Sequence, residues 1–329
     1  MSGINGVEIH DVFGLSQPLN KLVETVSKAI GKAYAPTHIR KIARAKADEI
    51  KIISSALNDT INLPAIYANG DITIKTNDYK ELAQRACNRL LYQELKKQEN
   101  IENILHYAYD ELKKEDSVSD QSVDEDWTIR FFNSVEDISN EKMQEIWGKI
   151  LAGEIKKPNS FSLRTLDTIK NLSQKEAELF QKIADYILCC MKQYFLYNEE
   201  SIFSKYNIFY SDFLLLEECN LLTTQALAFT VNIQENKKIP VFNKDIVGIF
   251  KTTLTGEHKL SIDIYSLTRS GEQLFNIINT TPNNAYTLDV FQDINKKAKN
   301  YKCCAYPVNY MKNGKINYDD DIDLLLKDQ

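Results

Sequence analysis

The side chains best suited to chemistry gather in one central block of the chain, residues 123–166. Acidic, basic and hydroxyl-bearing residues recur there at close spacing: Asp124, Asp126, Arg130, Glu154, Ser160, Ser162, Arg164 and Thr165. Arg164 could hold a phosphate or a carboxylate, because a planar guanidinium donates two parallel hydrogen bonds. The candidates for contacting a partner or a ligand are Arg130, Glu154, Ser162, Arg164 and Thr165.

A structural role explains the same residues and is the interpretation that we favour. The two arginines of the block would pair with its carboxylates, Glu154 or Asp126, and tie adjacent helices together. The serines would cap the ends of helices. Both interpretations place the block at the centre of the fold, because it also holds both tryptophans of the chain.

Catalytic patterns are missing from the sequence. A serine nucleophile in the block would need a base from a distant segment, since the chain has only four histidines: His10, His38, His106 and His258. None of them has another His or a Cys at a metal-ligand spacing, and neither GxGxxG nor GxxxxGK occurs. We therefore assign no catalytic residue, expect no metal or cofactor, and treat an enzyme with a site assembled from distant segments as the less favoured class.

The cysteines are expected to be free thiols. None of the six belongs to a CxxC motif, and they include two adjacent pairs, which do not form an easy disulfide with each other: Cys87, Cys189, Cys190, Cys219, Cys303 and Cys304. The N-terminus lacks the layout of a signal peptide, and no apolar run approaches the length of a membrane span. These features predict a cytoplasmic protein without a transmembrane segment.

Composition predicts a mainly α fold. The 329 residues are 43% hydrophobic and 26% charged, as in ordinary globular proteins, and only 11 Gly and 7 Pro are available for turns. The net charge of −6 provides no global attraction to nucleic acid or to an anionic membrane. We expect three regions: a helical N-terminal region (1–115), a central helical domain (116–198) and a C-terminal α+β domain (199–329).

The N-terminal region contains several amphipathic segments. Residues 15–30 predict a helix with a short apolar face, which could lie on a membrane surface. Residues 36–57 predict a second helix with an apolar stripe suited to self-association and a basic patch near its start, formed by Arg40, Lys41, Arg44 and Lys46. This patch could meet phosphates or an acidic partner, although a solvated face is the favoured interpretation. Two more helices are expected over 79–95 and 101–112.

Helix starts are expected throughout the central block. Asp124 begins one helix, Ser139 caps the next, and a short helix starts at Ser160 or Ser162. Ser173 and Glu176 match a capping box, which predicts a long helix through Ile187. The runs WGKILAGEI, SFSLRTL and LSQKEAELF in this part of the chain resemble an uncharacterised bacterial family, the domain of unknown function twenty-eight-zero-six. VDEDW and RFFN, and YAPTHIRKIARAKADEI near the N-terminus, are similar to it as well.

The resemblance implies no established activity. Genes of this family often lie in mobile or prophage-like surroundings, which implies a role in phage defence or prophage biology by association alone. The match is specific over residues 123–180 and weaker elsewhere.

The C-terminal region is expected to be winged-helix-like. A short helix at 211–222 precedes strands at 226–233 and 260–267 and a helix at 268–278, and YSLTRSGEQL is similar to the wing and closing helix of such domains. A helix that reads DNA needs basic or amide side chains, whereas this one carries Asp212, Glu217 and Glu218. We expect a module that contacts protein rather than DNA.

The sequence therefore favours a non-enzymatic interaction or scaffold protein that forms a homo-oligomer and binds an unknown protein partner. The alternative is a nucleic-acid-binding regulator that uses the winged-helix-like domain and the basic patch, which the acidic charge balance disfavours.

Overall fold

The computed structural model describes residues 16–30, 66–68, 71–73, 76–235, 237–298, 300–312 and 315–326. Contacts between Cα atoms divide the chain into two compact units, residues 1–166 and 167–329. Each unit has its own set of buried hydrophobic side chains. The expected three-region organisation, with boundaries at 115 and 198, stays a prediction.

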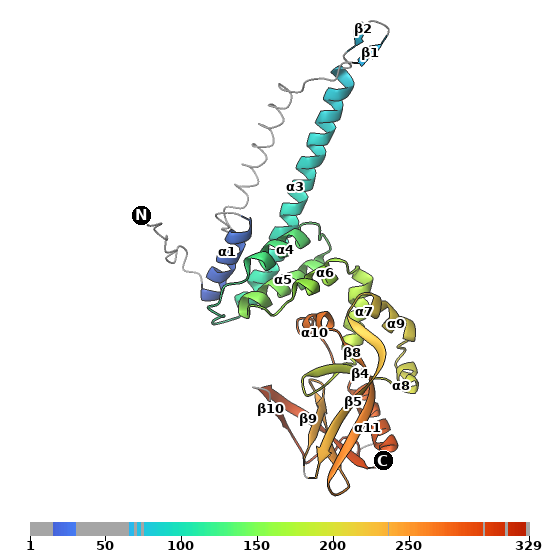
Figure 1. The fold of residues 1–329 in the computed structure, drawn as a ribbon. Coiled ribbons are helices and arrows are strands. Elements are labelled where there is room, and N and C mark those ends of the chain that lie inside the picture. Colours follow the sequence, from blue (N-terminus) through green and yellow to red (C-terminus); the bar gives the residue numbers. More distant parts are fainter. Residues whose placement is uncertain are drawn as a thin grey trace, which may run out of the picture. The chain divides into compact units, whose positions relative to one another are not determined.

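The described part of the first unit is helical apart from one short hairpin (Figure 1). Its elements are α1 (Gln17–Ile30), the antiparallel pair β1 (Ile66–Ala68) and β2 (Asp71–Thr73), α3 (Thr76–Leu112), α4 (Glu125–Val135), α5 (Glu141–Lys156) and the start of α6 (Leu163–Lys170). α1, α4, α5 and the C-terminal part of α3 pack together around a shared core. The expected helix over 36–57 lies outside the described residues.

Capping side chains determine where α4 and α5 begin. Asp124 Oδ1 accepts the Trp127 N–H at 2.8 Å, which confirms the expected start of α4. Asn140 Oδ1 accepts the Met143 N–H at 3.1 Å, so Asn140 caps α5 in place of the expected Ser139. The core between the two helices is aromatic: the Phe131 ring of α4 and the Trp147 ring of α5 meet edge to face with centroids 5.5 Å apart.

α3 is one helix of 37 residues, about 55 Å long at the usual rise per residue. The prediction of two helices, 79–95 and 101–112, was wrong. The run KKQEN between them contains no Gly or Pro, and its side chains form pairs along the helix: Lys96 Nζ lies 2.8 Å from Glu99 Oε2, and Gln98 Nε2 lies 3.2 Å from Glu102 Oε1. The N-terminal half of α3 extends away from α4 and α5 (Figure 1).

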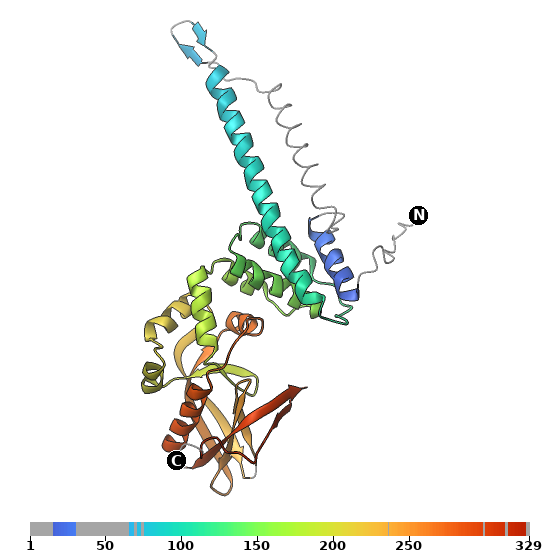
Figure 2. The ribbon, with the colours of Figure 1, turned by 180° about the vertical axis from the view of Figure 1, so that it is seen from behind.

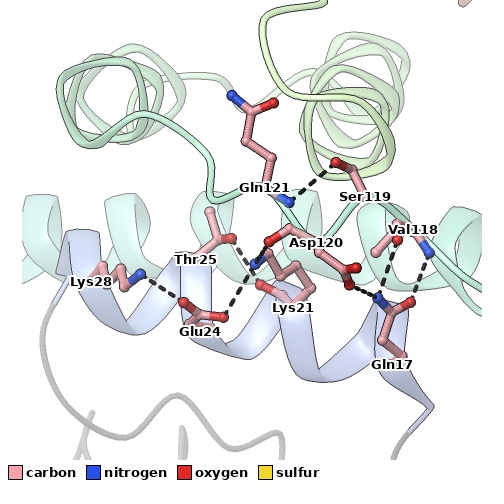
Figure 3. A network of polar contacts seen from close by, with 9 residues as sticks. All are labelled: Gln17, Lys21, Glu24, Thr25, Lys28, Val118, Ser119, Asp120 and Gln121. Carbon is pink, nitrogen blue, oxygen red and sulfur yellow. Dashed lines mark hydrogen bonds and ion pairs between the residues drawn. The ribbon is translucent and has the colours of Figure 1, made fainter. Parts of the chain in front are cut away.

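α1 is fastened to the polar loop that follows α3 (Figure 3). The Gln17 amide bonds the Val118 backbone twice: Nε2 donates to the carbonyl at 3.1 Å and Oε1 accepts the N–H at 2.7 Å. Lys21 Nζ donates to the Asp120 carbonyl at 3.2 Å. The apolar face of α1, considered above as a possible membrane contact, is buried in the core through Leu22 and Val26.

The described part of the second unit is built around an antiparallel sheet of eight strands in the order β10-β9-β7-β6-β3-β4-β8-β5. The strands are β3 (Leu188–Cys190), β4 (Gln193–Tyr197), β5 (Leu222–Gln234), β6 (Ile239–Phe242), β7 (Ile246–Thr252), β8 (Glu257–Leu267), β9 (Tyr301–Lys312) and β10 (Lys315–Tyr318). Figure 2 shows β9 and β10, in red, extending as a ribbon beyond the other strands. β5 and β10 form the two edges.

In the described part of this unit, five helices accompany the sheet: α7 (Gln174–Ala184), α8 (Glu200–Lys205), α9 (Tyr210–Glu218), α10 (Arg269–Phe275) and α11 (Asn284–Lys297). The capping box of α7 is confirmed: Ser173 Oγ accepts the Glu176 N–H at 3.3 Å, and Glu176 Oε2 accepts the Ser173 N–H at 2.6 Å. α10 begins at its cap Thr268, and Gly271 lets it approach the preceding turn. A Cβ on Gly271 would lie 1.9 Å from the Leu221 carbonyl oxygen.

The expectation of a mainly α fold with a winged-helix-like C-terminal domain was wrong. A winged helix carries a small wing, whereas the two strands recognised in the sequence, β5 and β8, are the end of the eight-stranded sheet. The helix expected to continue through Ile187 stops at Ala184, and the chain turns into β3. β9, which contains Pro307, lies between β7 and β10.

Candidate functional site

Glu154 organises the loop between α5 and α6. Its side chain is 1% exposed, and its two oxygens accept different backbone N–H groups: Oε1 that of Asn159 at 2.5 Å and Oε2 that of Phe161 at 2.9 Å. Burial raises the pKa of the Glu154 carboxyl above its usual value of 4.5, and the backbone donors oppose this shift. The carboxylate therefore replaces backbone partners that the loop lacks.

The same loop is held from α4 and α5. The Trp127 indole Nε1 donates to the Phe161 carbonyl at 2.8 Å. Gly153 leaves room for the Phe161 ring, since a Cβ at that position would lie 2.8 Å from the ring edge. Together with Glu154, these contacts fix residues 157–162 against the helices. The indole and the carboxylate bond the loop backbone, and the Phe161 ring packs beside Gly153; we call these contacts the Glu154 lock.

Ser162 and Thr165 meet at the start of α6. The Ser162 Oγ lies 3.2 Å from the Thr165 backbone nitrogen and 2.9 Å from the Thr165 hydroxyl, which is fully buried. Ser162 thus acts at a helix start, as the structural interpretation expected. Ser160 donates to the Lys157 carbonyl at 2.6 Å, again within the loop.

The arginines of the block stay apart from this lock. Arg130 and Arg164 are exposed, and neither forms an ion pair with a described residue. The expected pairing with Glu154 or Asp126 is therefore not seen, because the Glu154 carboxylate is occupied by backbone donors. Both guanidinium groups are left on the surface as candidates for contacting a partner. The basic patch Arg40, Lys41, Arg44 and Lys46 lies outside the described residues.

A second candidate surface, which the sequence did not single out, lies on α3. Its C-terminal part buries one face in the core through Ile101, Ile104 and Ala108. Counting back from Ile101 in steps of four and three residues leads to Lys97, Glu94, Leu90, Cys87 and Ala83, which share that face. No side chain from 82 to 99 is buried, and Leu90 is 51% exposed. We call Ala83, Ala86, Cys87 and Leu90 the α3 stripe.

Charged residues mark the lower end of the α3 stripe. Lys97 Nζ lies 3.0 Å from Glu136 Oε1 and 3.8 Å from Glu94 Oε1, which joins α3 to the residue that ends α4. These ion pairs separate the buried apolar residues, from Ile101 onward, from the α3 stripe. The signal in the sequence was that apolar residues return at the same four-and-three spacing on both sides of Glu94 and Lys97, which the prediction of two separate helices obscured.

Comparison with known proteins now places the chain. The family model described as "Protein of unknown function (DUF2806)" matches residues 84–291. The chain belongs to this family. The match begins within α3 and ends within α11, so DUF2806 spans half of the first unit and most of the second. No curated protein and no solved structure matches the chain.

The described residues of this DUF2806 protein contain no group of three or more His, Cys, Asp or Glu side chains placed to hold a metal ion. Among them, no helix is long and apolar enough to cross a membrane. All six cysteines are free, as expected. Burial raises the pKa of Cys189 to about 11 and that of Cys190 to about 12.

Proposed function

We propose that this protein is a non-enzymatic interaction or scaffold protein that self-associates through the α3 stripe. The observation that carries the proposal is one face of α3, which is buried in the core at Ile101, Ile104 and Ala108 and carries apolar side chains again at the α3 stripe. There Leu90 is exposed, and the other three residues are half-buried. A second copy of the same stripe is the proposed occupant. Residues Ala83 and Ala86 are small, so two helices can approach closely there.

The exposed part of the stripe provides a driving force for association. Leu90 is half exposed, and full burial of a leucine side chain contributes about 1.5–3 kcal/mol. No carboxylate or ammonium group belongs to the stripe itself, so two copies would meet without like-charge repulsion. Antiparallel pairing would also bring Cys87 near its counterpart, because it lies between Ala83 and Leu90 on this face.

Light scattering on the full chain after size-exclusion chromatography tests the proposal. We expect an oligomer for the native protein and a loss of at least one association step in Leu90→Lys. Tyr92→Lys is the matched control: Tyr92 is 70% exposed, and two residues of helix rotate its side chain about 200° away from Leu90. Tyr92→Lys should keep the native mass.

The outcomes separate the function classes. A native chain that is monomeric at every concentration, or one in which both lysine variants have the same effect, overturns the proposal. A monomer that elutes with a high ratio of absorbance at 260 nm to that at 280 nm would instead indicate a nucleic-acid-binding regulator.

The exposed Arg130 and Arg164 are the proposed contacts for a protein partner, and the cytoplasm and phage–host conflict are the proposed setting. Cells carrying the native protein should plate phage less efficiently than cells carrying Leu90→Lys. If phage plate equally well on cells carrying the native protein and on cells carrying Leu90→Lys, the proposed role in phage–host conflict is wrong. The assembly proposal is not affected by that result. In Arg164→Ala the oligomer should persist, because Arg164 is distant in sequence from the stripe and forms no ion pair with a described residue.

A further inference from the structure

The two edges of the eight-stranded sheet differ in how they are protected. β10 is an edge of four residues that carries Lys315 and is followed by Asp319 and Asp320. Short length and charge are the usual means of preventing a strand from joining an edge. β5 is an edge of 13 residues, LTTQALAFTVNIQ, without a single charged residue, proline or glycine.

The outer edge of β5 is free within the described chain. Residues 227–234 pair with 257–264 of β8 on one side, and no described backbone group pairs with residues 227–233 on the other. Unpaired N–H and C=O groups along a strand are a template for one more strand.

The side chains of β5 favour an added strand as well. Val231 and Ile233 are buried on the core side, whereas Leu227, on the same side, is 40% exposed. On the other side, Ala228, Thr230 and Asn232 are exposed and uncharged. An added strand would cover Leu227 and would meet no charge on the outer side.

We propose that β5 pairs antiparallel with β5 of a second copy, so that two sheets join edge to edge. A strand without charges does not repel its own copy, and core-side residues then face core-side residues. The two registers that pair most of residues 227–234 place Thr230 opposite either Thr230 or Asn232 of the second copy. The β5 contact alone would give a dimer. Assemblies larger than a dimer also need the α3 contact proposed above, and to that extent this inference rests on the proposed function. With two different self-pairing surfaces on one chain, the native protein forms such assemblies as its concentration rises.

Thr230→Lys tests the contact. Two lysines would then lie at or next to the two-fold axis and would repel each other. Ser261→Lys is a matched control, because Thr230 Oγ1 and Ser261 Oγ lie 3.3 Å apart on neighbouring strands and both residues are exposed. Each variant adds one charge and removes the same side-chain hydrogen bond, but the lysine at 261 is about 4.8 Å further from the edge.

Sedimentation velocity over a range of concentrations gives the first readout. We expect assemblies above a dimer for the native chain and Ser261→Lys, a dimer for Thr230→Lys, a dimer for Leu90→Lys, and a monomer for Thr230→Lys combined with Leu90→Lys. Loss of all association in Leu90→Lys alone overturns the β5 contact and leaves the α3 proposal standing. Loss of all association in Thr230→Lys alone does the reverse.

Amide hydrogen exchange gives a readout that a merely structural effect would not produce. In the native chain, exchange in residues 227–234 should slow as the protein concentration rises, because outward N–H groups become paired. The Thr230→Lys chain should show no concentration dependence there. If the native chain exchanges these amides at the same rate at low and high concentration, the proposal is wrong, and an added strand from another protein becomes the remaining use of this edge.

Discussion

Glu154 illustrates how a residue chosen for its chemistry can serve the fold. A buried carboxylate between two helices attracts attention as an acid, a base or a ligand. Here its oxygens are 2.5 Å and 2.9 Å from the backbone nitrogens of Asn159 and Phe161. Arg130 and Arg164 are exposed and do not pair with Glu154. The polar residues of the central block therefore fall into two groups: those that hold the loop between α5 and α6, and the arginines, which lie on the surface.

Glu154→Gln should destabilise the first unit by about 1–3 kcal/mol at pH 7, because the amide keeps one acceptor oxygen and turns a donor toward the other backbone N–H. Urea unfolding followed by tryptophan fluorescence is the suitable measurement, since both tryptophans, Trp127 and Trp147, lie in this unit. Glu125→Gln, at an exposed position of α4, is the control and should change the unfolding free energy by less than about 0.5 kcal/mol. Equal effects of the two substitutions would contradict the role of Glu154.

The pH dependence of that unfolding should carry a defined sign. The folded pKa of Glu154 is raised above 4.5, so the folded state holds this proton more tightly than the unfolded state does. The contribution of Glu154 is therefore fully present below pH 4.5 and decreases as the pH rises through the folded pKa. The stability advantage of the native chain over Glu154→Gln should be larger at pH 4.5 than at pH 8. A constant difference would show that the Glu154 pKa is not raised.

The cysteines provide a second prediction at this scale. Burial raises the pKa of five thiols, at Cys189, Cys190, Cys219, Cys303 and Cys304, and so suppresses their reactive thiolates. Cys87 is partly exposed on the α3 stripe. Iodoacetamide at pH 8 should modify Cys87 first, and the rate should fall as the protein concentration rises. Peptide mass spectrometry reads out both effects, and a rate independent of concentration would argue against the stripe as a contact.

At the scale of elements, the close approach of two backbone segments explains why a glycine is needed at position 271. Gly271 sits in the first turn of α10, where the Thr268 side chain caps the helix by accepting its N–H at 3.1 Å. The turn at Leu221 passes so near that only a residue without Cβ fits. One glycine thus positions α10 against the start of β5.

Gly271→Ala should destabilise the second unit by about 1–3 kcal/mol, because the backbone of Leu221 must move to admit a methyl group. Thermal unfolding followed by circular dichroism would show a lower midpoint. Arg269→Ala, at an exposed position of the same helix, is the control and should leave the midpoint nearly unchanged. A native midpoint in Gly271→Ala would mean that the turn at Leu221 yields easily.

At the scale of the whole molecule, both proposed contact surfaces are apolar or uncharged, although the chain carries a net charge of −6. The α3 stripe and the β5 edge are regions where the overall negative charge is locally absent. Association through them should depend on apolar burial and backbone pairing rather than on ion pairs.

Raising the salt concentration about tenfold, from about 0.05 M to about 0.5 M, shortens the Debye length about threefold and should leave the oligomer intact. Light scattering at both concentrations is the measurement. An oligomer that dissociates at the higher salt would point to charged contacts, such as the basic patch, in place of the α3 stripe. A stronger oligomer at high salt agrees with the proposal, because screening reduces repulsion between acidic chains.

Local side-chain chemistry determined several features that could be read from the sequence alone. The start of α4 at Asp124, the capping box of α7 at Ser173 and Glu176, and the strands β5 and β8 depend on residues close together in the chain. Family membership also follows from the sequence, through the motifs of the central block. These signals are local because caps and alternating side chains act over a few residues.

The sheet was decided by tertiary structure. β3 and β4 are joined by a turn at Met191 and Lys192, which both have positive φ (50° and 70°). Such turns usually contain Asn and Gly, so this one could not be recognised from its residues. β3 meets β6 at Cys189 and Phe242, more than fifty residues apart. The Glu154 lock likewise depends on where the loop carries Asn159 and Phe161. Propensity describes each short segment separately, whereas backbone pairing between distant segments determines whether they become a sheet.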